Sequence, residues 1–197
     1  MVSNICKIEN GTADLKAILQ ESERVGNYNG LTQKETLQLR LICEEIDGML
    51  PNVIGEFNGD FWIEFEDDVC KVNACIDIPE LNTTKKEELI SLAKNKKNAA
   101  AVGIVGKIRN VIENLFLTEQ ATIVYDSDNS FYMTKGYHNQ IDFSCIWSLN
   151  NYKTTCEKAD EDGWDELEKS IIANLADDVI VGVKGKKANI VVVKKFR

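Results

Sequence analysis

Two glycines that lie three residues apart are the first residues in this chain whose spacing could do chemistry. Gly103 and Gly106 stand in the run AVGIVGKIR, and Lys107 and Arg109 follow closely. A glycine turn that opens a helix can present backbone N–H groups and the positive end of the helix dipole to a phosphate. Alternatively, glycines let a helix pack closely against a neighbour, although each costs about 1 kcal/mol of helix stability relative to alanine. The residues alone leave both interpretations open.

The cysteines, the histidine and one acidic run are not spaced for metal binding or nucleophilic catalysis. Six cysteines occur, none of them in a C-x-x-C pair. Cys70 and Cys75 lie an odd number of residues apart in one expected strand, which directs them to opposite faces. His138 is the single histidine, and the DSDN run at Asp126 lacks the glycine and closing glutamate of a calcium loop. We therefore expect reduced, partly buried thiols and no metal.

Charge and length limit the class of protein. The chain has 197 residues, a net charge of −9 and an isoelectric point of about 4.8. Nonspecific nucleic-acid binding depends on lysine and arginine neutralising phosphates, so this charge argues against a nucleic-acid partner. No basic and apolar leader opens the sequence, and no run approaches the roughly 20 apolar residues of a membrane span. The sequence predicts a cytoplasmic protein with no membrane partner and a single domain over residues 1–197.

Hydrophobic periodicity predicts helices and strands in alternation. The expected helices lie in 12–30, 31–52, 83–98, 104–116 and 160–176. The expected strands lie in a hairpin at 59–79, in 121–150 and in a closing hairpin at 178–197. Thr32 and Glu35 form a T-x-x-E capping box for the second helix, and Pro51 helps to stop it.

These elements together predict an α/β (α+β) fold. It is a two-layer sandwich, with helices packed on one face of a mixed or mainly antiparallel sheet. The run NIVVVK near the end has adjacent apolar residues, which is typical of a strand buried on both faces. We therefore expect the closing hairpin to join the same sheet.

The order of the elements, and several residues in it, resemble the histidine-kinase-like ATPases with the Bergerat fold, the GHKL group. Within that group the chain looks most like the small anti-sigma-factor serine kinases. The run LKAILQESERVGNYNGLTQKETLQLRLICEEI is similar to their first two helices, and GDFWIEFEDDVCKVNACIDI is similar to their hairpin. The resemblance covers about residues 12–117, and residues 118–197 would add strands and an α-β-β unit.

The second helix carries the first motif of that family. There, a glutamate positions the attacking water or hydroxyl, and an asparagine four residues later ligates Mg²⁺ from the same helix face. Glu45 matches the glutamate, but Met49 stands at the asparagine position. The other register pairs Glu44 with Gly48, and Asp47 lies away from that face. The resemblance therefore implies a catalytic Glu45 without its metal ligand.

The adenine and phosphate motifs are also incomplete. In the family, a D-x-G-x-G aspartate accepts a hydrogen bond from the adenine amino group. Asp77 matches it, but Pro79 and Leu81 replace the two glycines, and proline fixes φ. The phosphate-binding glycine turn would be Gly103–Gly106, with Lys107 adding positive charge.

A second register is open for the last motif. The run SIIANLADDVIVGVKGKKANIVVVKKF resembles the closing helix and hairpin of the same kinases. Residues 82–160 would then be an insertion, and the turn would fall on ELEKS, which has no glycine. We favour the first register because of its glycines and spacing.

With these motifs damaged, the resemblance implies a regulatory module more than an enzyme. Phosphoryl transfer depends on metal and positioning, and the metal ligand is missing. The expected partner is a regulatory protein, either sigma-factor-like or anti-anti-sigma-like, and ATP is bound weakly or not at all. One alternative is an ATP-dependent serine kinase that uses Glu45, Asp77 and the Gly103–Gly106 turn. Another is a structural domain of that fold with no nucleotide role. The resemblance also implies that Glu45, Asp77 and Gly103 lie around one concavity.

Overall fold

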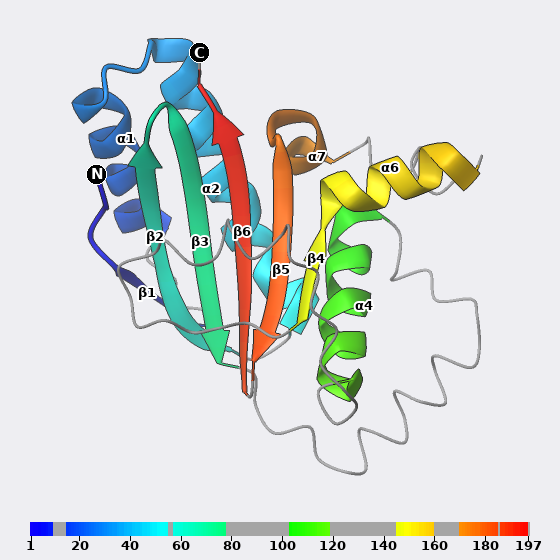
Figure 1. Cartoon of the computed structure of the whole chain (residues 1–197). Coiled ribbons are helices and arrows are strands. Elements are labelled where there is room, and N and C mark those ends of the chain that lie inside the picture. The colour runs from blue at the N-terminus through cyan, green and yellow to red at the C-terminus, as the bar shows by residue number, and fades with distance from the viewer. Residues whose placement is uncertain are drawn as a thin grey trace.

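The computed structural model describes residues 1–9, 15–54, 57–77, 103–118, 145–159, 170–184 and 186–196. In this part of the chain, six strands form one sheet and five helices accompany it (Figure 1). The strands are β1 (Cys6–Glu9), β2 (Asn58–Glu66), β3 (Val69–Asp77), β4 (Cys145–Ser148), β5 (Asp178–Lys184) and β6 (Lys187–Lys195). The helices are α1 (Leu15–Tyr28), α2 (Gln33–Ile54), α4 (Gly103–Thr118), α6 (Leu149–Ala159) and α7 (Ile171–Leu175).

Several predictions concern residues outside these ranges. They are the short helix in 83–98, the first strands of 121–150 with the Asp126 run, and the roles of Pro79, Leu81 and His138. These stay predictions.

The sheet is antiparallel at every pairing and has the strand order β1-β2-β3-β6-β5-β4. β6 pairs with β3 from Val69 opposite Lys195 to Asp77 opposite Lys187, and with β5 on its other side. The closing hairpin therefore lies in the middle of the sheet, as Figure 1 shows for the orange and red strands. This confirms the prediction that the hairpin joins the same sheet.

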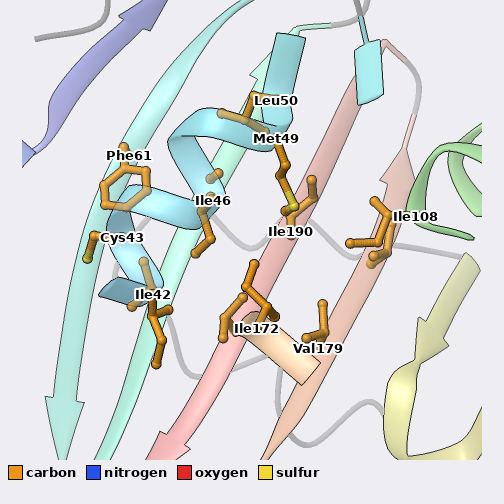
Figure 2. Packing of buried hydrophobic residues seen from close by; sticks show 14 of the residues in the cluster. Ile42, Cys43, Ile46, Met49, Leu50, Phe61, Ile108, Ile172, Val179 and Ile190 are labelled. Atoms are coloured by element: carbon orange, nitrogen blue, oxygen red, sulfur yellow. The ribbon is translucent and has the colours of Figure 1, made fainter. Parts of the chain in front are cut away.

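Side-chain alternation places the described helices on one face of the sheet. Ile63, Val72, Val192 and Val179 lie side by side across four strands, and all four are buried in the main hydrophobic core. Every described helix adds buried residues to that same core, among them Ile18, Ile46, Ile108, Leu149 and Ile172. Figure 2 shows the α2 side chains Ile46 and Met49 on the side of the helix that faces the sheet, with Met49 pointing toward Ile190. The two-layer prediction is confirmed.

The opposite face of the sheet has a smaller apolar cluster. Ile180, Val191 and Val193 are buried there, and Val69 packs against them. Asn73 lies in the same set of alternate positions and is also buried. The consecutive valines of β6 are therefore buried on both faces, which is what their sequence predicts.

Local signals explain the turns and helix starts near the N-terminus. The Thr32 N–H and hydroxyl both donate to Glu35 Oε2 at 2.7 Å, and the Glu35 N–H donates to Thr32 Oγ1 at 3.3 Å, so the capping box is formed. Between β2 and β3, Asp67 and Asp68 have φ values of 50° and 64°. Two successive left-handed residues are typical of the turn that joins a twisted hairpin. Asp and Asn tolerate that conformation better than most residues.

Three boundaries differ from the sequence prediction. Of the helix expected in 160–176, the structure describes residues 170–176, and there α7 begins only at Ile171 because Ser170 is extended. Pro51 does not stop α2, which continues to Ile54, because Leu50 and Val53 on its last turns are buried in the core. That packing outweighs the backbone hydrogen bond that proline removes. The strand expected through residue 150 ends at Ser148, and α6 begins at Leu149.

Candidate functional site

The two glycines of the candidate phosphate turn have different environments. Gly103 is the first residue of α4 and has a φ of 79°, a left-handed conformation that favours glycine. Gly106 lies inside α4 and is buried. Gly103 therefore fits the turn interpretation, and Gly106 fits the close-packing interpretation.

The two cations after the glycines interact with side chains of the described chain. The Lys107 ammonium lies 3.8 Å from the centroid of the Tyr152 ring on α6, a cation–π contact. Tyr152 in turn lies beside Trp147, with 6.0 Å between ring centroids. Arg109 Nε donates to Glu113 Oε1 at 2.9 Å. Holding a phosphate with Lys107 would therefore require this side chain to leave the tyrosine ring.

Met49, at the position where the resemblance would require a Mg²⁺ ligand, is a core residue. Only 3% of its surface is exposed. In Figure 2 its sulfur lies beside Ile190 of β6, on the side toward Ile108 of α4. A thioether is a soft donor, whereas Mg²⁺ takes hard oxygen ligands. An apolar side chain therefore fills this position.

The carboxylates of α2 lie near Met49 in sequence but not in one cluster. Glu45 is half-buried, and Glu44 accepts a hydrogen bond from Arg40 Nε at 3.2 Å. Asp47 Oδ1 is buried without a hydrogen-bond partner among the residues that the structure describes. Burial raises the pKa of the Asp47 carboxyl above its ordinary value.

Asp77, the candidate adenine acceptor, lies on the other side of the sheet from α2 and α4. Its neighbour Ile76 is buried in the core beneath the helices, and successive strand residues point to opposite faces. Lys187 Nζ donates to Asp77 Oδ1 at 2.6 Å, with both side chains about half exposed. This hydrogen bond is the main reason that the pKa of Lys187 is raised.

The structure thus brings only part of the candidate site together. α2, which carries Glu45, packs against α4, which begins at Gly103. Asp77 ends β3, which α2 also contacts, but its side chain points to the face of the sheet that the described helices do not cover. One concavity around Glu45, Asp77 and Gly103 stays a prediction, and the direction of Asp77 argues against it.

The cysteines are free thiols, as far as the structure describes them. Cys43 and Cys70 are buried, and Cys6 and Cys75 are partly buried. Cys70 lies in the core beneath the helices, and Cys75 lies at an odd spacing from it on the other face, as predicted. In the described ranges, no group of three or more His, Cys, Asp or Glu side chains could hold a metal ion.

The sequence analysis missed a polar cluster where β4 meets α6. Ser148 Oγ donates to Asp178 of β5 at 2.9 Å, and the Asn150 N–H donates to Asp178 Oδ1 at 3.0 Å. The Asn151 N–H donates to Ser148 Oγ at 3.3 Å, so both side chains cap the start of α6. A serine followed by LNNYK was a weak local signal for this helix start.

No protein-family model, no curated protein and no solved structure matches this chain. Among the described residues, no helix is both long enough and apolar enough to cross a membrane.

Proposed function

We propose that the chain is a degenerate histidine-kinase-like ATPase domain that acts as a regulatory, partner-binding module in the cytoplasm. Its partner is a regulatory protein of the sigma-factor or anti-anti-sigma type, and it binds that partner without a nucleotide. Two things support the proposal. The order of helices and strands resembles that of the histidine-kinase-like ATPases, and residues that this family needs are replaced in the metal and adenine motifs.

The observation that carries the proposal is the burial of Met49. A side chain with 3% exposure, packed beside Ile190, leaves no room for a hydrated cation at its position. Mg²⁺ usually keeps several waters and bridges the phosphates of a bound nucleotide. A domain that has replaced its metal ligand with a core residue has lost the main electrostatic element of phosphoryl transfer.

The ion pair of Asp77 supports the same proposal. A carboxylate that recognises adenine must accept a hydrogen bond from the base amino group, and here the base would have to share the Asp77 carboxylate with the Lys187 ammonium, which donates to Oδ1. The candidate phosphate contact of Lys107 is similarly engaged with Tyr152. Two of the expected ligand contacts thus serve the internal structure of the domain.

One observation favours the second candidate, an ATP-dependent serine kinase. Gly103 has left-handed backbone geometry at the first residue of α4, which is what a phosphate-binding turn at a helix start needs. The kinase hypothesis therefore has a specific residue in its favour, and the experiment must separate the two.

A thermal-shift titration with Mg²⁺ and ATP tests the proposal. A ligand at 100 times its dissociation constant stabilises the native state by about 2.7 kcal/mol. For a domain of this size that is a rise of roughly 5–10 °C in Tm. We expect millimolar ATP with Mg²⁺ to move the midpoint by less than about 2 °C, because Met49 cannot ligate Mg²⁺ and Asp77 is paired with Lys187.

Two matched variants make the titration decisive. Asp77→Asn and Lys187→Gln both break the same surface ion pair, but only the first replaces the charged carboxylate that is the candidate adenine acceptor with a neutral amide. A shift above about 2 °C that Asp77→Asn abolishes and Lys187→Gln retains would establish nucleotide binding and favour the kinase. Transfer of labelled phosphate to a serine of a captured partner would overturn the proposal.

Capture of the partner tests the second part of the proposal, that the chain binds a regulatory protein without a nucleotide. We expect a regulatory protein to be retained equally with and without Mg²⁺-ATP when the full chain is immobilised. Retention of no partner under either condition would favour a structural domain without a regulatory role.

A further inference from the structure

We draw no further inference here: the strongest candidate, the apolar strip of Ile180, Val191 and Val193 on the sheet face opposite the helices, is already buried within the chain, and nothing in the described residues shows what covers it.

Discussion

Individual glycines in this chain serve different physical needs. Gly103 needs a left-handed φ, and Gly59 of β2 needs the absence of a side chain. A Cβ on Gly59 would collide with the Cys75 carbonyl oxygen and lie 3.0 Å from the Ile76 Cα. Gly48, in contrast, lies on the exposed face of α2, and a Cβ there would meet nothing within 4 Å.

Alanine substitutions at Gly59 and Gly48 should change the free energy of unfolding in opposite directions. We expect Gly59→Ala to lower the free energy of unfolding by about 1–3 kcal/mol, because backbone atoms must move apart. We expect Gly48→Ala to raise it by about 0.5–1 kcal/mol, because alanine favours the helix. Urea denaturation of the two variants measures both values, and a loss of stability in Gly48→Ala would contradict this account.

The buried thiols should make stability fall at alkaline pH. Burial raises the pKa of Cys70 to about 12 and raises the pKa of Cys43 well above its ordinary value. Unfolded thiols ionise near pH 8.5, so between that pH and about 12 the unfolded state binds fewer protons. The stabilising contribution is complete below about pH 8.5 and is lost as the pH rises.

The measurement is the urea midpoint of the original chain and of Cys70→Ala at about pH 7.5 and about pH 10. We expect the original chain to lose more stability between the two pH values than the variant, whatever their difference at neutral pH. Equal losses would show that the Cys70 thiol ionises as readily in the native state as in the unfolded state.

At the scale of elements, α6 depends on a residue far away in sequence. Asp178 accepts hydrogen bonds from Ser148 and from the Asn150 N–H, which links the start of β5 to the start of the helix. We expect Asp178→Ala to cost about 0.5–2 kcal/mol, as the loss of a helix cap does. Faster amide hydrogen exchange confined mainly to α6 and β4 would be the signature.

The control for this prediction is Asn150→Ala, which changes an exposed side chain in the same turn and keeps the backbone N–H. In Asn150→Ala, amide hydrogen exchange in α6 should be as slow as in the original chain or slower. Equal exchange rates in the two variants would mean that Asp178 does not hold the helix.

Elements with local signals could be predicted, and those with distant partners could not. The Thr32–Glu35 box is encoded within four residues and forms as predicted. The hairpin predicted at 59–79 also forms, and its Asp67–Asp68 turn is a local feature as well. The start of α6 depends on Asp178, 28 residues beyond Asn150, so local periodicity could not reveal it. For the same reason, the pairing that occupies Asp77 depends on Lys187, which no pattern around Asp77 predicts.

At the scale of the whole molecule, the sheet is completed by strands that lie well beyond residues 12–117, the range of the resemblance. β6 is the neighbour of β3, and β5 is the described partner of β4. Without this hairpin, β3 would become an edge strand whose N–H and C=O groups on that side are unpaired. The core is therefore shared between the two ends of the sequence.

A chain that ends at residue 160 should not fold. It lacks β5 and β6, and with them the buried face of Val179, Val181, Ile190 and Val192. We expect circular dichroism without a cooperative thermal transition and aggregates on gel filtration, whereas the full chain unfolds cooperatively. A cooperative transition in the shortened chain would show that the first half holds an independent core.

The central place of β6 also sets how fast this protein can reach its native state. Asp77 and Lys187 meet across the β3–β6 pair although 110 residues separate them. Contacts so distant in sequence must be found by diffusion before they repay the lost chain entropy, so folding takes milliseconds or longer, unlike a helical bundle of local contacts.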